Sequence, residues 1–338
     1  MAHKTMVGGT TYSVTGGKSM VSGTSYSISL GKTMVGGTVY EVSFKPKPIY
    51  AMYYSDNSIV FQRGNNGESG KNLINSYTNF ANQSYAGYTG IPWYMHNNNI
   101  KIVTFNNISV NTIDYWFYNA TNLTSINYTG LDIDNVVSMY WAFDYCYNLT
   151  GSPVSWNNVT NMASAYYYCN NLTGSPVCGP NVTNMHQTYA YCSNLTGSPA
   201  CGDNVVNMSN AFRYCSNLTG QPVCGKNVQQ MASAYYCCNN LTGNPVCGPN
   251  VTNMYETYAY CKNLHGNMYI YSNNVRNFTN CFKGRDNSKM LNIYTYNPYN
   301  IYSVTTQISI VGNRISWTAD TTNKRWYNTK YNIYIYQL

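Results

Sequence analysis

The chain has 338 residues, of which only 9% are charged and 37 are tyrosine, and its formal net charge is +8. This shortage of charge beside so many aromatic residues excludes the charge-rich composition of an intrinsically disordered chain. No apolar run is long enough to span a bilayer and none forms a leader segment near the first residue, so we expect neither membrane insertion nor a secretory signal.

Residues 4–44 contain a repeat with a 14-residue period, KTMVGGTTYSVTGG, KSMVSGTSYSISLG and KTMVGGTVYEVSF. Each unit alternates β-branched, aromatic and polar residues around glycine, which predicts a small β-hairpin. Three such units hold too little apolar surface for an independent core. We therefore expect residues 1–48, which end in the stiff Lys-Pro-Lys-Pro segment, to be an anchoring domain that docks onto a partner or oligomerises, with a trimer as one possibility.

Residues 49–108 begin with two strand-like runs in IYAMYYSDNSIVFQRG and end with IPWYMHNNNIKIVTF. The apolar side chains of Trp93, Ile100, Ile102 and Phe105 indicate an N-terminal β cap that closes the first turn of the array that follows.

Residues 109–285 carry a second repeat, with a period of 23 residues. A strict period of this size predicts a solenoid, in which each repeat buries its apolar face against its neighbours. One cysteine and one leucine in each repeat keep the same spacing as the methionines Met139, Met162, Met185, Met208, Met231 and Met254.

Within one repeat, Met162, Ala165, Tyr166 and Cys169 are spaced i, i+3, i+4, i+7, which predicts one face of a short helix. The proline-containing segment after each leucine predicts short, irregular strands. Asparagines that recur in every repeat are expected to bond the backbone of neighbouring turns. The fold class expected from these patterns is an α/β repeat solenoid. The Tyr, Ile and Thr alternation of residues 286–338 adds a C-terminal β-rich cap.

Ten of the twelve cysteines fall into two ladders, one at Cys146, Cys169, Cys192, Cys215, Cys238 and Cys261, the other at Cys178, Cys201, Cys224 and Cys247. Every rung has two equivalent neighbours, so no disulfide pairing is unique, and we favour free buried thiols over disulfides or a metal site. No C-x2-C pair is followed by a second pair, and no serine–histidine–aspartate or paired-carboxylate motif is specific. We expect no cofactor and no catalysis.

Positions that vary among the repeats indicate the outward face, because packing demands invariance. Tyrosine, tryptophan and asparagine side chains there suit recognition of carbohydrate or protein. The candidate ligand surface comprises Tyr140, Trp141, Tyr167, His186, Gln187, Asn210, Arg213, Tyr236, Tyr255 and Glu256.

The segment from Asn181 to Thr196, NVTNMHQTYAYCSNLT, resembles the BspA-like leucine-rich-repeat family of bacterial surface proteins. The resemblance covers residues 50–285 and implies a leucine-rich-repeat-like fold that binds host cells or matrix. One departure is that Leu-Thr-Gly-x-Pro-Val replaces the Leu-x-x-Leu-x-Leu of the family, which predicts a shorter or irregular concave strand.

Residues 4–44 resemble short repeats at the start of phage virion proteins. Together the two resemblances imply a non-enzymatic virion protein, of the tail-fibre or receptor-binding type, that is assembled in the host cytoplasm. Its partners would be other virion proteins, through residues 1–48, and a host-cell surface glycan or protein, with no nucleic acid among them. The alternatives are a capsid-decorating or head-fibre protein and an adhesin on the bacterial cell surface.

Overall fold

The computed structural model describes residues 3–7, 10–14, 18–21, 24–28, 44–81, 83, 85–271, 275–296, 318–320 and 322–338, with side chains from Lys47 onward. The chain divides into two compact units. The first comprises Met1–Gln83, Ile102–Ser109 and Ile126–Asp132, and the second comprises Ser84–Lys101, Val110–Ser125 and Ile133–Leu338.

The first two 14-residue units form antiparallel strand pairs, as their alternation predicts. Strand β1 (His3–Val7) pairs with β2 (Thr10–Val14). Strand β3 (Lys18–Val21) pairs with β4 (Thr24–Ile28), which also pairs with β5 (Phe44–Pro46). Most of the third unit lies outside the described residues.

The predicted strand runs of residues 49–108 belong to a five-stranded sheet in the order β11-β9-β7-β6-β8. Strands β6 (Ile49–Tyr54) and β7 (Ser58–Arg63) form an antiparallel hairpin, β8 (Leu73–Tyr77) pairs antiparallel with β6, and β9 (Ile102–Asn106) pairs parallel with β7. Strand β11 is Ser125–Asn127, and a separate parallel pair joins β10 (Ile108–Ser109) to β12 (Leu131–Asp132).

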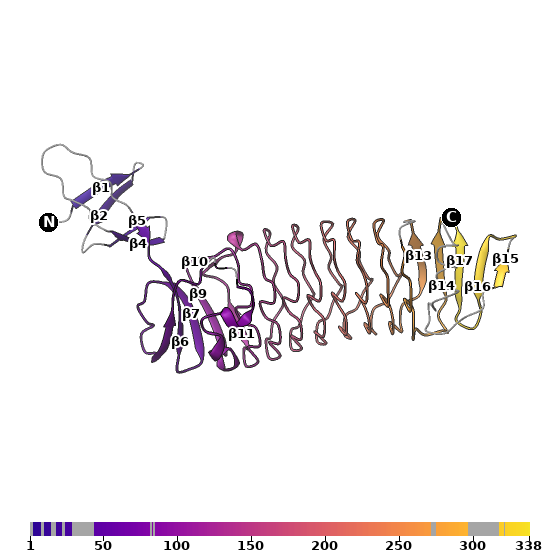
Figure 1. Ribbon diagram of the computed structural model, residues 1–338, viewed down its shortest axis with the longest axis horizontal. Helices are drawn as coiled ribbons and strands as arrows, with labels where there is room; N and C mark the ends of the chain where they lie inside the picture. Colours follow the sequence, from indigo (N-terminus) through magenta and orange to yellow (C-terminus); the bar gives the residue numbers. More distant parts are fainter. Residues whose placement is uncertain are drawn as a thin grey trace. The chain divides into compact units, whose positions relative to one another are not determined.

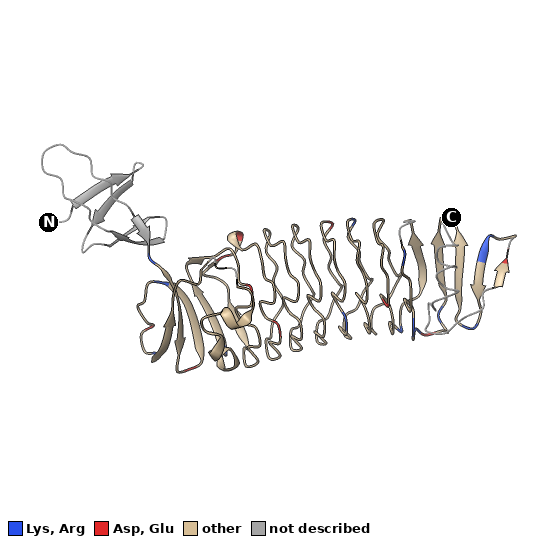
Figure 2. Ribbon diagram, viewed as in Figure 1, with Lys and Arg blue, Asp and Glu red and all other residues tan. Residues whose placement is uncertain are grey.

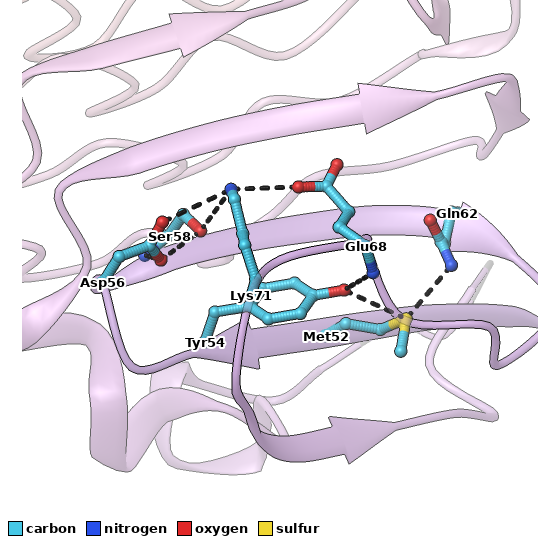
Figure 3. A network of polar contacts seen from close by, with 7 residues as sticks. All are labelled: Met52, Tyr54, Asp56, Ser58, Gln62, Glu68 and Lys71. Carbon is cyan, nitrogen blue, oxygen red and sulfur yellow. Dashed lines mark hydrogen bonds and ion pairs between the residues drawn. The ribbon is translucent and has the colours of Figure 1, made fainter.

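A polar network fastens the loop after β7 to this hairpin (Figure 3). The Lys71 Nζ lies 2.9 Å from Glu68 Oε2, 3.4 Å from Asp56 Oδ2 and 3.0 Å from Ser58 Oγ. The Glu68 amide donates to the Tyr54 hydroxyl at 2.9 Å. Partly exposed ion pairs such as these contribute little free energy each, so the network serves mainly to position the loop.

The 23-residue repeats of the second unit follow one another as successive coils of similar shape (Figure 1). Backbone hydrogen bonds join each coil to the next. In the repeat that begins at Met162, the amides of Met162, Ser164, Tyr166 and Tyr168 donate to carbonyls of the next repeat at 2.8–3.0 Å. The same pattern recurs in the following repeats, and parallel bridges run from Thr112 to Asn277, one residue per repeat. These four amides donate to the repeat that follows, whereas the amides of Thr173 and Thr183 donate to carbonyls of the preceding repeat, at Gly151 and Thr160.

The prediction of a short helix in each repeat is wrong, since the described residues contain no α-helix and only three 3₁₀ helices, η1 (Tyr88–Gly90), η2 (Tyr94–Asn99) and η3 (Ile133–Asn135). The Ala165 amide donates to Met162 O and the Cys169 amide to Tyr166 O. The third residue of each four-residue turn has positive φ, 53° at Ser164 and 59° at Tyr168, as in type II turns. Two successive turns thus reproduce the i, i+3, i+4, i+7 spacing of a helix.

The invariant residues of the repeats form the core. The repeat methionines are fully buried, and one aromatic ring per repeat stacks on the next with centroids 5.3–5.7 Å apart, from Phe117 to Phe282. As predicted, the recurring asparagines bond neighbouring repeats, with Asn181 Nδ2 donating to Asn157 O at 2.9 Å. No named strand lies between η3 and β13, so the proline-containing segments are irregular.

Both ends of the repeat array are covered within the second unit. Before the first repeat, Trp93 Nε1 donates to Trp116 O and Asn97 Nδ2 to Tyr118 O, both at 2.9 Å. After the last repeat, Arg285 Nη1 donates to Tyr331 O at 2.6 Å. The sheet at that end has the order β13 (Gly266–Ile270), β14 (Leu291–Thr295), β17 (Ile333–Gln337), β16 (Arg325–Asn328) and β15 (Thr318–Asp320).

Candidate binding surface

A ladder of half-buried tyrosines runs along one face of the repeats. Tyr145, Tyr168, Tyr191 and Tyr214 stand six residues after the methionine of their repeats, and each has positive φ of 59–66°. Their rings are stacked with centroids 5.2, 4.2 and 4.8 Å apart in that order. Because each ring covers the face of the next, this tyrosine ladder presents ring edges and hydroxyls to solvent.

A groove with a volume of about 350 Å³ follows the tyrosine ladder across four repeats. One wall is the ladder itself, continued by Cys237, and the other carries small polar side chains two residues further along each repeat. The lining residues are Tyr168, Asn170, Tyr191, Ser193, Tyr214, Ser216, Cys237 and Asn239. The amide oxygens of Asn170 and Asn239 have no hydrogen-bond partner in the part of the chain that the structure describes. The groove therefore combines aromatic edges with small polar side chains.

A smaller pocket of about 190 Å³ lies at the N-terminal end of the ladder, where Tyr145 contributes to its wall. The aromatic pocket is lined by Tyr118, Trp141, Asp144, Tyr145, Ser164, Tyr167 and Gln187. The Asp144 side chain is 1% exposed, and desolvation raises its pKa from the ordinary value to about 8. Burial likewise raises the pKa of Tyr118 to about 12. A carboxyl group is thus held among rings in a setting that disfavours its charge.

The cysteine ladders are buried or half-buried thiols, and all twelve cysteines are free. In the inner ladder, Cys192 Sγ donates to Tyr166 O at 2.9 Å, and Cys215 Sγ to Tyr189 O at the same distance. Burial raises the pKa of Cys201 to about 12 and that of Cys224 to about 11. Such thiols are weak nucleophiles. Among the residues with described side chains, no group of three or more His, Cys, Asp or Glu is placed to hold a metal ion.

Residues 92–199 match a protein-family model described as "Mycoplasma protein of unknown function, DUF285". This match spans less than a third of the chain. Among solved structures, the chain is similar to a leucine-rich repeat protein from Bacteroides ovatus, with 14% identity, a TM-score of 0.43, and coverage of 76% of this chain and 71% of that chain. No curated protein matches.

The ten residues predicted for the ligand surface are all at least partly exposed, but they do not form one cluster. Trp141, Tyr167 and Gln187 meet in the aromatic pocket. The Arg213 guanidinium lies 4.0 Å from the ring centroid of Tyr236, in a cation–π contact. The others are dispersed over the array, namely Tyr140, His186, Asn210, Tyr255 and Glu256.

Individual contacts explain several of these dispersed positions. Tyr140 packs edge-on against Tyr115 with centroids 5.3 Å apart, and Tyr255 is 38% exposed. His186 is half-buried rather than fully exposed, and burial lowers its pKa. Asn210 occupies a turn position with φ of 56°. Glu256 Oε1 accepts a bond from Asn280 Nδ2 at 3.4 Å.

The positions that vary among the repeats did not predict the groove, because its tyrosines hardly change from one repeat to the next. Tyr168, Tyr191 and Tyr214 were not among the residues predicted for the ligand surface, yet they are partly exposed. Among the six repeats that carry the methionines, the exception is Cys237, which shows that the position accepts a different side chain. Charged residues are scattered and few along the repeats (Figure 2), so charge offers no further guide. Within the described residues, no helix is long and apolar enough to cross a bilayer.

Proposed function

We propose that this chain is a non-enzymatic adhesion protein whose leucine-rich-repeat-like solenoid presents the groove to a glycan or protein on a host cell. The observation that carries the proposal is the groove itself, which offers a tyrosine edge in three successive repeats and a small polar side chain in four. A site repeated at regular intervals suits an extended or repetitive ligand, because equal weak contacts add through effective concentration.

The proposed setting is the virion of a tailed phage, as a tail fibre or receptor-binding protein. In this proposal residues 1–48 attach the chain to other virion proteins and oligomerise it. The support is the resemblance of residues 4–44 to virion repeats and the strand pairing of the first two units. Decoration of the capsid and display on a bacterial surface are the alternatives that the following experiment separates.

Fluorescently labelled full-length protein would be incubated with a panel of intact bacterial cells and, separately, with purified phage capsids. The blocking variant is Ser193→Tyr with Ser216→Tyr, which fills the groove. Tyrosine stands at the same repeat position in Tyr147, so the fold accommodates it. The matched control is Ser198→Gln, outside the groove, because Gln221 occupies that position in the next repeat.

We expect saturable binding to some of the cells, lost in the blocking variant and retained in the control. Tight binding to capsids without any binding to cells would reject receptor binding in favour of decoration. Cell binding that survives the blocking variant would place the adhesive surface elsewhere on the chain.

A further inference from the structure

The aromatic pocket is bounded by rings in two perpendicular orientations. The rings of Tyr118 and Trp141 lie 23° from parallel with centroids 5.6 Å apart. The ring of Tyr145 is at 88° to that of Tyr118, and the ring of Tyr167 is at 89° to that of Tyr145, with centroids 6.0 and 5.6 Å apart. A pocket bounded in this way meets ring faces as well as edges, and the faces carry the negative end of the aromatic quadrupole.

Asp144 adds a carboxyl group to these walls. Its side chain is 1% exposed, lines the pocket, and its Oδ1 has no hydrogen-bond partner in the described part of the chain. The repeat does not require an acid at this position, where Tyr167, Ala190 and Arg213 stand in the next three repeats. A buried carboxyl oxygen without a donor is costly unless something outside the chain pairs with it.

The groups that face Asp144 supply no positive charge. The titratable side chains that interact with it electrostatically are phenols and thiols, namely Tyr118, Tyr145, Tyr147, Tyr167, Cys169 and Cys192. None of the ion pairs among the described residues includes it. The electronegative character of the pocket therefore comes from the ring faces and, when Asp144 is ionised, from its carboxylate.

We propose that the aromatic pocket binds an alkylammonium group, a quaternary or methylated ammonium head. Such a cation is attracted to ring faces and is too weakly hydrated to need several oxygen ligands. A divalent metal ion would need those ligands, and the residues here do not provide them. A volume of about 190 Å³ is below that of pockets for drug-sized ligands and suits a compact head group.

This inference names a ligand class for one end of the surface proposed above and rests on that proposal for its biological setting. The proposed adhesive function and the binding of a cation by the aromatic pocket can be rejected independently of each other. Cell attachment that persists in a variant unable to bind the cation would show that the aromatic pocket is not the adhesive contact. Cation binding by a chain that attaches to no cell would support the aromatic pocket as a binding site and reject adhesion.

The test is calorimetric titration of the full-length protein with choline chloride and, as a neutral analogue of the same shape, 3,3-dimethyl-1-butanol. The variants are Asp144→Ala and Trp141→Gln, which the array itself tolerates, because Ala190 and Gln187 stand at the same repeat positions. The control is Ser198→Gln, which lies outside the pocket and introduces the residue found at Gln221, its position in the next repeat.

We expect one choline per chain, at least tenfold weaker binding of the neutral analogue, and a loss of at least tenfold in either variant but not in the control. Affinity should rise as the pH increases from 6 to 9, because the cation favours the ionised form of Asp144, whose pKa is about 8 in the empty pocket. Equal binding of the neutral analogue, or choline binding unchanged in Asp144→Ala, would overturn the proposal. So would methyl glycosides that bind the pocket when choline does not.

Three carriers of the same head group distinguish its source. These are free choline, vesicles of phosphatidylcholine, and a peptide that contains trimethyl-lysine. If any of them binds and this binding is lost in Asp144→Ala, the result supports the aromatic pocket as the site and identifies the carrier. If none of them binds, the proposal is overturned.

Discussion

The hydroxyl of Tyr189 donates a hydrogen bond to the carbonyl of Val177 at 2.6 Å and accepts one from the amide of the same residue at 3.2 Å. Tyr166, Tyr235 and Tyr258 make the same pair of bonds to the valine twelve residues before them. In each of these four repeats one buried phenol thus satisfies two backbone groups of a segment that forms no strand.

Replacing Tyr189 with phenylalanine should therefore lower the free energy of unfolding by about 1–3 kcal/mol, because both Val177 groups lose their partner. The reciprocal change is available at Phe212, which occupies the same position opposite Ala200. We expect Phe212→Tyr to raise stability by about 1 kcal/mol. Urea unfolding followed by circular dichroism checks both, and a shift of the two variants in the same direction would contradict the explanation.

The buried Asp144 should make the protein less stable as pH rises. Its folded pKa of about 8 lies above the unfolded value of about 4. Between these values the native state binds more protons than the unfolded state, so stability falls through that window and is constant above it. We expect Asp144→Asn to remove this fall and to be more stable than the parent chain at pH 9, by a few kcal/mol in order of magnitude, but not at pH 4.

A suitable control for that measurement is Asp203→Asn. Asp203 is exposed and its hydrogen bond with Lys226 lowers its pKa, so its contribution has the opposite sign and is lost as the pH falls. Denaturation midpoints of the parent chain, Asp144→Asn and Asp203→Asn, measured from pH 4 to pH 9, test this prediction. An unchanged pH profile in Asp144→Asn would show that this carboxyl group is not the cause.

The thiols of the inner cysteine ladder should react with iodoacetamide only when the protein unfolds. Cys169, Cys192 and Cys238 are fully buried, and desolvation raises their pKa well above the ordinary value. Cys237 is half-buried in the wall of the groove and should be labelled first. Mass spectrometry of peptides labelled at pH 8, with and without guanidinium, gives the order in which the cysteines react. Early labelling of Cys192 in the native protein would contradict the packing described.

Arg285 should be the most sensitive single residue at the C-terminal end. It is 6% exposed, and its guanidinium donates to the carbonyls of Tyr331 and Lys289. Arg285→Met would leave both carbonyls without their donor and should lower the free energy of unfolding by roughly 2 kcal/mol. Arg285→Lys keeps a charge but not the fork of donors, so we expect an intermediate loss. Urea unfolding gives the free energies, and hydrogen exchange over residues 325–338 tests whether the loss is local.

The period of the array and the identity of its core could be predicted from the sequence, but the local backbone could not. Met162, Ala165, Tyr166 and Cys169 are buried, as the spacing predicts. Helices and successive four-residue turns bury the same positions, so burial periodicity does not distinguish them. The deciding feature is the left-handed conformation at Ser164 and the residues equivalent to it. These residues are not glycine, so the sequence gives little sign of it.

The binding surface was only partly predictable for a related reason. Repetition makes a residue invariant whether it is held by packing or used at the surface, and the sequence alone does not separate the two. Trp141 and Tyr167 were found because their positions vary, whereas Tyr191 was missed because its position hardly does. Asp144 could be seen as a variant, but its burial depends on rings that come from three different repeats.

The regular recurrence of the backbone hydrogen bonds between repeats gives the array an evolutionary freedom. Every repeat presents the same set of backbone donors and acceptors to each of its two neighbours, so any two copies make compatible neighbours. Unequal recombination that removes or duplicates 23 codons therefore produces a chain whose junctions are already satisfied. Each such event changes the length of the array by about 5 Å, the spacing of hydrogen-bonded chains. Selection can thus change the length of the array in small steps, while the segments that cover its two ends stay the same.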